Sequence, residues 1–239
     1  MVDFHSHILP GIDDGSASVQ ESIMMLQMEK EQGIEHVIAT PHFYPRYDKP
    51  EAFLSRRDAA EEQLRKEMEK NPDLPRISVG AEVYFFHGIS ESEYLPQLAV
   101  HGHNCILIEM PFSRWIESMY RELTQIHERW GIVPIIAHID RYVRPWHAQH
   151  TLRKLESLPV MVQANAGSFL DRGRKGLAMR MLKQGHIQLL GSDCHNAKER
   201  APNLGEAIAC IQKQIGDDMV ERLQENSKSL QIAQNEIAK

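Results

Sequence analysis

The sequence predicts an α/β fold in which seven strand–helix units close a parallel sheet into a barrel. Short apolar segments alternate with amphipathic segments along the whole chain, and this alternation is typical of parallel strands joined by right-handed crossovers. The chain has 239 residues, a length at which an α/β barrel forms one domain. The sequence contains no linker, low-complexity run or shift in composition, so we expect a single domain over residues 1–239.

Seven apolar segments have the length and the composition of buried strands. In chain order, they cover residues 4–8, 34–40, 77–83, 105–110, 132–138, 160–164 and 187–192. The first strand also carries two histidines, His5 and His7, at alternate positions. Side chains two residues apart on a strand share a face, so both imidazoles are expected to point the same way.

Seven helices are expected between and after these strands. They cover residues 18–33, 50–70, 113–130, 146–157, 175–183, 204–215 and 219–234. Ser18 and Glu21 form a capping-box pattern at the start of the first helix, and Gly33 is placed to end it. Asn71 and Pro72 end the second helix, because proline cannot continue a helix.

The composition indicates a packed protein without a nucleic-acid or membrane surface. Hydrophobic residues make up 42% of the chain, and the net charge is −6, which argues against the basic face of a nucleic-acid-binding protein. Three cysteines without paired spacing, Cys105, Cys194 and Cys210, predict a reducing cytoplasm. We expect no signal peptide and no membrane insertion, because the longest apolar run, 132–139, is too short to span a bilayer.

A metal-capable or hydrogen-bonding side chain stands at the carboxyl end of every predicted strand. The series is His5 and His7, His42, Glu82, Glu109, His138, Asn165, and Asp193 with His195. A single polar side chain at a strand end is ordinarily only solvated, but chance does not explain seven at the same end. In a barrel, these ends converge on one face, where active sites lie.

The convergent side chains predict a site for divalent metal ions. A Pro-Gly turn after His7 delivers two carboxylates, Asp13 and Asp14. Four carboxylates would then share one pocket: Asp14, Glu82, Glu109 and Asp193. Such crowding is unstable without compensation, and three divalent ions would leave the pocket positive and attractive to phosphate. Imidazole and carboxylate ligands suit Mn, Fe or Zn and do not select among them.

These residues lie in motifs that resemble those of PHP-domain (polymerase and histidinol phosphatase) proteins. The resemblance is strongest to the manganese-dependent tyrosine phosphatases of bacterial capsule and exopolysaccharide operons. The matching motifs are HSHILPGIDDG at 5–15, IATPH at 38–42, GAE at 80–82, EMP at 109–111, HIDRY at 138–142, QANAGS at 163–168 and SDCHN at 192–196. They extend over nearly the whole chain.

The resemblance implies a distorted seven-stranded barrel with three metal ions, manganese above all, at the carboxyl ends of the strands. The implied metal ligands are His5, His7, Asp14, His42, Glu82, Glu109, His138, Asp193 and His195. Glu82 is implied as the bridging ligand, and Arg141 and Arg200 as the residues that bind phosphate. The family usually has Pro-Glu where this chain has Ile139 and Asp140, so loop geometry and substrate preference are less firmly implied.

The implied activity is hydrolysis of phosphotyrosine by a metal-activated hydroxide, with both arginines stabilising the transition-state charge. The implied partner is the phosphotyrosine tail of a bacterial tyrosine autokinase in capsule or exopolysaccharide synthesis. Two alternatives stay open: a small-molecule phosphatase acting on histidinol phosphate or a sugar phosphate, and a catalytically silent, metal-stabilised scaffold. Aromatic residues in the loops after His42 and Glu82 favour a phenolic substrate: Tyr44, Tyr47, Tyr84, Phe85 and Phe86.

One motif also fits a cysteine mechanism. Cys194 to Arg200 matches the Cys-x5-Arg signature of cysteine-dependent tyrosine phosphatases, which need a thiol of lowered pKa. Here Cys194 lies between Asp193 and His195, and a neighbouring carboxylate raises the pKa of a thiol. If both neighbours face the metals, period-two alternation turns Cys194 away, so we expect its thiol to be a bystander.

Overall fold

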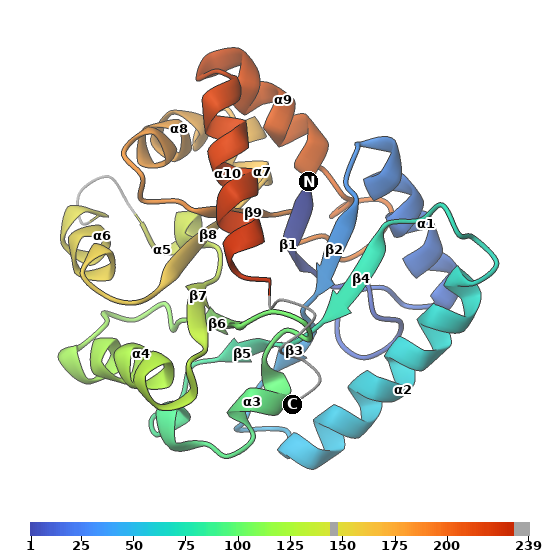
Figure 1. Cartoon of the computed structure of the whole chain (residues 1–239), viewed down its shortest axis with the longest axis horizontal. Coiled ribbons are helices and arrows are strands. Elements are labelled where there is room, and N and C mark those ends of the chain that lie inside the picture. The colour runs from blue at the N-terminus through green and yellow to red at the C-terminus, as the bar shows by residue number, and fades with distance from the viewer. Residues whose placement is uncertain (144–147, 232–239) are drawn as a thin grey trace.

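The strands form a curled parallel sheet surrounded by helices, as the computed structural model in Figure 1 shows. The structure describes residues 1–143 and 148–231. The strands in these ranges are β1 (Val2–Ser6), β2 (His36–Ala39), β3 (His42–Phe43), β4 (Arg76–Val79), β5 (Glu82–Tyr84), β6 (Cys105–Glu109), β7 (Val133–Ile136), β8 (Met161–Asn165) and β9 (Leu189–Gly191). All the paired strands are parallel, as the alternation of strands and helices predicted.

The strands belong to two sheets, ordered β1-β2-β4 and β3-β5-β6-β7-β8-β9. β2 passes into β3 through Pro41, and β4 passes into β5 through Gly80. Pro41 lacks the N–H that a strand ladder needs, and a Cβ at Gly80 would meet Val100 at 2.9 Å. The strands expected at 34–40 and 77–83 are therefore both interrupted, and the single seven-stranded barrel stays a prediction.

The two ends of the strand series meet at a seam between β1 and the segment that follows β9. Ser6 and Cys194 form a parallel bridge across this seam. The Asp193 N–H donates to His5 O at 2.7 Å, and the His7 N–H donates to Cys194 O at 2.9 Å. The seam therefore places the histidine motif at the start of the chain directly beside the motif that follows the last strand.

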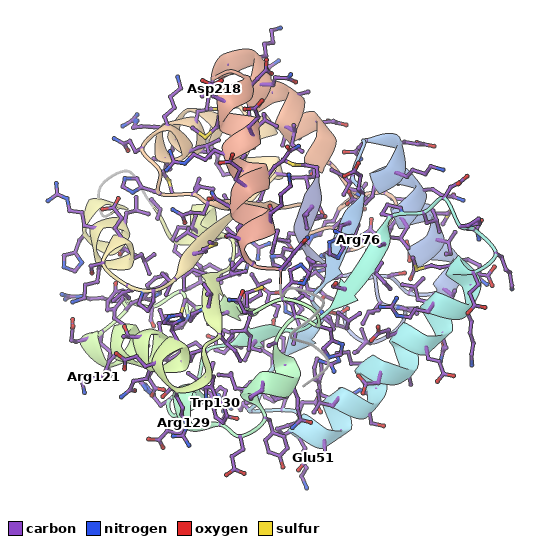
Figure 2. All side chains as sticks on the ribbon, viewed as in Figure 1. Glu51, Arg76, Arg121, Arg129, Trp130 and Asp218 are labelled. Atoms are coloured by element: carbon purple, nitrogen blue, oxygen red, sulfur yellow. The ribbon has the colours of Figure 1, made fainter. Side chains whose placement is uncertain are left out.

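The helices lie around the outside of the strands (Figure 1). They are α1 (Val19–Glu31), α2 (Pro50–Met68), α3 (Leu95–Leu98), α4 (Glu117–Trp130), α5 (Ile139–Tyr142), α6 (Ala148–Glu156), α7 (Gly167–Leu170), α8 (Lys175–Lys183), α9 (Leu204–Gln214) and α10 (Asp217–Ser229), with a 3₁₀ turn, η1 (Ile89–Glu91). Charged side chains of both signs cover their outer faces, for example Glu51, Arg121 and Asp218 (Figure 2). None of the helices in the described ranges is long and apolar enough to cross a membrane.

Several predicted boundaries are wrong by a few residues. The first strand ends at Ser6, so His7 lies just beyond it. The helix expected from residue 113 begins at Glu117, because Trp115 Nε1 donates to Pro111 O at 2.9 Å and holds the preceding segment in an irregular conformation. The short helices α3, α5 and α7 were not predicted, since four residues carry too little periodicity to be recognised.

The two helices expected at 146–157 and 219–234 extend beyond the described residues. α6 covers Ala148–Glu156, and residues 146 and 147 lie outside the described part of the chain. α10 begins at Asp217, two residues before the expected start, and ends at Ser229. Residues 232–234 of the same prediction lie outside the described ranges.

The apolar core has two parts, one on each face of the curled sheet. Alternate side chains on β6 divide between them: Ile106 and Ile108 face the helices, whereas Leu107 faces the interior of the curl. The interior cluster also takes Phe4 from β1 and Leu189 from β9. Because these strands are far apart in the sequence, the interior cluster holds the curl together and fixes where the strand ends meet.

Candidate metal centre

The implied ligands gather around the ends of the strands, although the interrupted strands change where some of them stand. His5 lies on β1, Glu109 is the last residue of β6, and His138 follows β7. His42 and Glu82 are the first residues of β3 and β5, immediately after the breaks at Pro41 and Gly80. Asp193 and His195 follow β9 and reach the same place because of the seam with β1.

The Glu82 carboxylate is the centre of the cluster, and it is buried. Its oxygens lie 2.9 Å from His138 Nε2, 2.9 Å from His42 Nδ1, 3.2 Å from His5 Nε2 and 3.4 Å from His7 Nε2. Burial by itself would raise the pKa of Glu82, but the charge of His5 and hydrogen bonds from His138 and His42 hold it well below the usual value. Glu82 is therefore an anion to which four imidazoles point.

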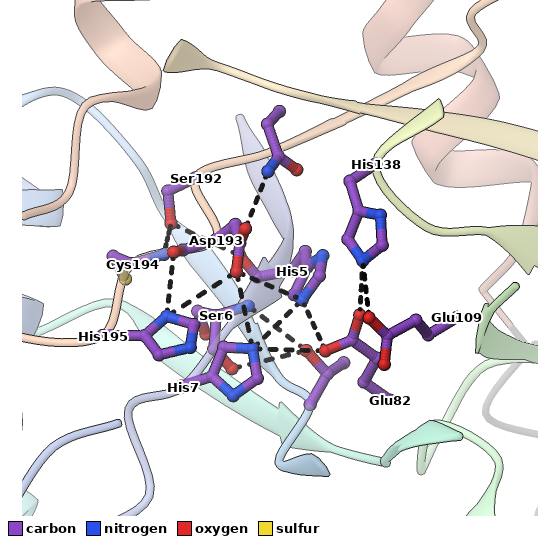
Figure 3. Close-up of polar contacts among 12 residues, drawn as sticks. His5, Ser6, His7, Glu82, Glu109, His138, Ser192, Asp193, Cys194 and His195 are labelled. Carbon is purple, nitrogen blue, oxygen red and sulfur yellow. Dashed lines mark hydrogen bonds and ion pairs between the residues drawn. The ribbon is translucent and has the colours of Figure 1, made fainter. Parts of the chain in front are cut away.

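His5 and His7 point the same way, as their alternate positions predicted (Figure 3). Their Nε2 atoms are 3.1 Å apart, and each lies 3.6 Å from Asp193 Oδ1. Burial lowers the pKa of His7, yet the hydrogen bond with Asp13 and the nearby Glu82 raise it to about 10. Two ring nitrogens facing each other beside carboxylates form a donor set that a divalent cation would satisfy.

Asp14 approaches the cluster from its more exposed side. Asp14 Oδ1 lies 3.6 Å from His42 Nε2 and 3.5 Å from His195 Nε2. Burial and the neighbouring His7 lower the pKa of His195 to about 4. On the opposite side, Glu109 Oε1 lies 3.7 Å from His138 Nε2, and burial together with Glu82 raises the pKa of Glu109.

The side chains present fit divalent metal ions. In the described ranges, three groups drawn from the implied ligands offer donor atoms that lie within 4.8 Å of one another: His7, Asp14, His42 and His195; His5, His7 and Asp193; and His42, Glu82 and Glu109. Glu109 Oε2 and His195 Nε2 are buried and have no hydrogen-bond partner among these residues. Buried polar atoms without partners are rare, and a cation would satisfy both.

Three further polar residues orient the implied ligands, and sequence reasoning did not assign them this role. Asp13 accepts from His7 Nδ1 at 2.8 Å and from the His42 N–H at 2.9 Å. Gln163 Oε1 accepts from the His138 N–H at 2.6 Å and lies 3.5 Å from His5 Nδ1.

The third orienting residue, Asp3, accepts from the His5 N–H at 3.1 Å, and from the Ser192 N–H at 2.8 Å and Oγ at 2.5 Å. Such outer contacts fix ring orientation in metal sites. Asp3 and Asp13 lie close to His5 and His7 in the sequence, and this proximity was the signal from which their orienting role could have been predicted.

Both implied phosphate-binding arginines reach Asp193. Arg141 Nη2 and Arg200 Nη2 donate to its carboxylate, Arg200 at 2.9 Å. Asn165 Nδ2, at the end of β8, donates to the same carboxylate at 2.7 Å. Burial would raise the pKa of Asp193, but His5 and Arg141 lower it to about 2.

A polar cavity of about 220 Å³ adjoins Asp193, and a third arginine, Arg174, lines it together with Arg141 and Arg200. Arg174 Nη1 lies 3.8 Å from Asp140 Oδ2, and Asp140 Oδ1 accepts from the Asn165 N–H at 2.9 Å. Asp140, which stands where the resemblance implied a glutamate, therefore still places a carboxylate beside Arg174. Arg174 was not predicted, because no motif contains it.

The Cys194 thiol lies away from the cluster, as the alternation along this segment predicted. It is buried within 4.8 Å of the Asp3 and Glu29 carboxyls and does not line the cavity beside Asp193. Burial, and then the charges of Glu29 and Asp3, raise the pKa of the Cys194 thiol well above its usual value. A buried thiol of raised pKa lacks the reactivity that a nucleophilic cysteine needs.

The aromatic residues after His42 and Glu82 divide between the surface and the core. Tyr44 OH lies 3.2 Å from His42 Nδ1, and Tyr47 is 80% exposed. Both line a cavity of about 610 Å³ beside Asp14. Phe85 is buried in the core instead, so only part of the expected aromatic surface lies near the cluster.

Comparisons with known proteins show the family to which the chain belongs. The model of the family described as capsular polysaccharide synthesis, CpsB/CapC, matches residues 1–231. The chain is similar to the tyrosine-protein phosphatase YwqE of Bacillus subtilis (strain 168), with 30% identity over 96% of this chain and 91% of that protein.

Two solved structures extend the comparison. One belongs to a study of YwqE from Bacillus subtilis and CpsB from Streptococcus pneumoniae, described as unique metal-dependent tyrosine phosphatases. It has a TM-score of 0.84 at 27% identity and covers 96% of this chain and 94% of that chain. The histidinol phosphate phosphatase of Lactococcus lactis shares the fold, with a TM-score of 0.57 at 16% identity over 89% of this chain and 92% of that chain. The chain therefore belongs to the CpsB/CapC family of capsular polysaccharide synthesis proteins.

Proposed function

We propose that this chain is a metal-dependent protein-tyrosine phosphatase that acts in capsule or exopolysaccharide synthesis. The observation that carries the proposal is the cluster of imidazoles and carboxylates around Glu82, which adjoins a cavity lined by Arg141, Arg174 and Arg200. A cation-binding cluster beside three guanidinium groups suits the charge of a phosphate monoester. The names of the relatives, tyrosine-protein phosphatases, support the same activity.

The metal complement that fits best is three divalent ions. The proposed ligands are His5, His7, Asp14, His42, Glu82, Glu109, His138, Asp193 and His195. The three donor groups within the cluster support this number, although two of them share His7 and two share His42. Glu82 is the proposed bridging ligand because it faces four imidazoles. Manganese is the proposed metal, and the donor set would also accept iron or zinc.

The chain's own residues would bind and orient the phosphate. Arg141 and Arg200 line the cavity of about 220 Å³, so their guanidinium donors would hold the oxygens of a phosphate bound there and stabilise its charge in the transition state. Asn165 keeps Asp193 in place. Bound divalent ions would supply Lewis-acid stabilisation and lower the pKa of water. Phenol, with a pKa near 10, leaves more readily than an alkanol, so no general acid is assigned.

The same proposal extends to the whole chain. Each interrupted pair, β2 with β3 and β4 with β5, is interpreted as one bent strand, which makes seven strands in a distorted barrel over a single domain of residues 1–239. The proposed substrate is the phosphotyrosine tail of a bacterial tyrosine kinase, and the proposed location is the cytoplasm. The capsule-synthesis family to which the chain belongs supports this setting.

A substrate panel tests the activity. The manganese-loaded protein should hydrolyse phosphotyrosine peptides with a kcat/KM well above that for phosphoserine peptides of matched sequence, because the phenolate leaves more readily. Histidinol phosphate and a sugar phosphate complete the panel. Faster turnover of either small molecule would assign the protein as a small-molecule phosphatase, and no turnover of any ester with metals bound would make it a silent scaffold.

A further inference from the structure

An aromatic groove leads outward from the metal cluster on the side of His138. The Tyr142 ring, on α5, lies 5.4 Å from the His138 ring between centroids. Phe112 and Trp115 follow at 5.3 Å and 5.2 Å from Tyr142. This series of rings walls a cavity of about 620 Å³ that also includes Arg114 and Arg141. Phe112, Arg114 and Trp115 come from the segment between β6 and α4, which was expected to be helical from residue 113, and α4, α5 and α6 supply the rest of the lining.

Arg141 joins the groove to the proposed phosphate cavity, because it lines both. The phosphate cavity, at about 220 Å³, has room for a small anion. The groove is nearly three times larger and exceeds the volume of one phenol ring. A phosphotyrosine held at Arg141 would therefore place its ring against Tyr142 and leave room in the groove for neighbouring residues of the peptide.

The rim of the groove favours acidic neighbours of the phosphotyrosine. Arg114 lines the groove and forms no salt bridge with any residue in the described ranges. Phe112 is 70% exposed, so its ring is accessible to a bound peptide. An exposed ring beside an uncompensated guanidinium offers both stacking area and a charge partner to a peptide.

The other cavity beside the cluster has the opposite character. It is lined by Asp13, Asp14 and Asp48, and its arginine, Arg56, is already paired with Asp48. This cavity therefore offers an acidic phosphopeptide no arginine that is free of a salt bridge within the described ranges. Of the two large cavities that flank the cluster, the groove beside Tyr142 is therefore the one with complementary charge.

We infer that the groove formed by Phe112, Arg114, Trp115 and Tyr142 binds the peptide segment next to the phosphotyrosine and prefers acidic residues there. The inference rests on the proposed phosphatase function and adds a substrate preference to it. The phosphotyrosine ring lies against Tyr142, the neighbouring residues pack on Phe112 and Trp115, and an acidic side chain pairs with Arg114.

A binding measurement tests the groove without relying on turnover. The probe is a fluorescein-labelled peptide with a non-hydrolysable phosphotyrosine mimic, flanked by either aspartates or lysines. Fluorescence anisotropy gives its Kd for the manganese-loaded protein. We expect Phe112→Ala to raise the Kd about threefold to tenfold, the usual range for losing an aromatic contact. Arg114→Glu should abolish or reverse the preference for the aspartate-flanked peptide.

Tyr47→Ala is the matched control, because Tyr47 is an exposed aromatic residue in the carboxylate-lined cavity. It should leave the Kd at the wild-type value. Thermal melting of all three variants checks that they are folded, and none of the three sites is a core position. Wild-type Kd values for both Phe112→Ala and Arg114→Glu would overturn the inference, as would a weakened complex in Tyr47→Ala alone.

The outcomes separate the groove from the phosphatase proposal. Hydrolysis of phosphotyrosine peptides together with wild-type peptide binding by Phe112→Ala and Arg114→Glu would remove the groove and keep the function. Peptide binding that depends on Phe112 and Arg114, without hydrolysis of any phosphate ester, would keep the groove and remove the phosphatase function. If both proposals are correct, Phe112→Ala lowers kcat/KM more for the aspartate-flanked phosphopeptide than for p-nitrophenyl phosphate.

Discussion

Asp193 connects the cluster of imidazoles and carboxylates to both implied phosphate-binding arginines. Its Oδ1 lies 3.6 Å from both His5 Nε2 and His7 Nε2, while Arg141 and Arg200 donate to the same carboxylate. One side chain therefore couples the position of the arginines to that of the proposed metals. This arrangement would keep the arginines close enough to act on a phosphate held by the proposed metals.

Replacing either arginine should reduce catalysis without releasing metal. Arg141→Ala and Arg200→Ala each delete charge-assisted contacts that strengthen in the transition state, so kcat/KM should fall roughly tenfold to a thousandfold, or about 1.4 to 4 kcal/mol. Steady-state kinetics on p-nitrophenyl phosphate and metal analysis of the same samples measure both quantities. Arg129→Ala, on the outer face of α4, is the control. Unaltered rates in both variants would show that phosphate binds elsewhere.

Replacing the buried cysteine should have little effect on the reaction. Cys194→Ser keeps the size of the side chain, and the Cys194 thiol lies beside Asp3 and Glu29, away from the phosphate cavity. Most of the activity should therefore persist in a kinetic assay of the metal-loaded variant. A loss of roughly a thousandfold with metals still bound would instead support a covalent cysteine mechanism.

The sequence was a good guide to the residues that converge on the site. It was a poorer guide to the contacts that hold these residues in position. The nine implied ligands lie in recognisable motifs in or near the strands, so their gathering could be predicted. Their role as ligands stays a prediction. Gln163 and Arg174 could not be assigned in the same way. Gln163 acts through the backbone N–H of His138, which follows β7, and Arg174 reaches the cavity from the segment before α8.

At the scale of single elements, helix α1 buries a carboxyl group beside Asp3 and Cys194. Glu29 is fully buried, and neither of its oxygens has a hydrogen-bond partner in the described ranges. Burial, and then the charge of Asp3, raise the pKa of Glu29 well above its usual value. The helix therefore packs against β1 with an acid that stays protonated to a higher pH than an exposed glutamate does.

This buried acid should make stability fall as pH rises. The pKa of Glu29 is higher in the folded protein than in the unfolded chain, where it is about 4.3. The contribution of the protonated carboxyl to the free energy of unfolding is therefore complete below about pH 4.3. It is lost as the pH rises toward the pKa that Glu29 has in the folded protein. Glu29→Gln cannot ionise, so its Tm should exceed that of the wild type by more at about pH 8.5 than at about pH 5.5. Differential scanning calorimetry at fixed metal concentration measures this difference. Glu31→Gln, exposed on the same helix, is the control, and an equal difference at both pH values would contradict an ionisable, buried Glu29.

The interrupted strands and the late start of α4 show what periodicity misses at this scale. The segments 34–40 and 77–83 read as continuous strands because apolar residues recur along both of them. Their breaks depend on Pro41 and on the close approach of Gly80 to Val100, and the second of these is a tertiary contact. Similarly, the hydrogen bond from Trp115 to Pro111 O keeps 111–116 irregular. The same segment then forms the wall of the aromatic groove.

At the scale of the whole molecule, the seam between β1 and the segment after β9 decides where the site forms. It places the motif around His5 beside the motif around Asp193, although nearly the whole chain separates them. The parallel α/β arrangement was predictable from the order of elements alone. The three cavities around the cluster were not, because their shape depends on side-chain packing between segments that share no sequence pattern.

The central claim is that the cluster around Glu82 binds divalent metal ions and that hydrolysis depends on them. Its most direct test is the rate of p-nitrophenyl phosphate hydrolysis before and after exhaustive chelation, with metal content measured on the same samples. The account predicts that chelation abolishes turnover and that manganese, or a related divalent ion, restores it in proportion to the ions bound. Undiminished turnover in a preparation verified to be free of metal would contradict it.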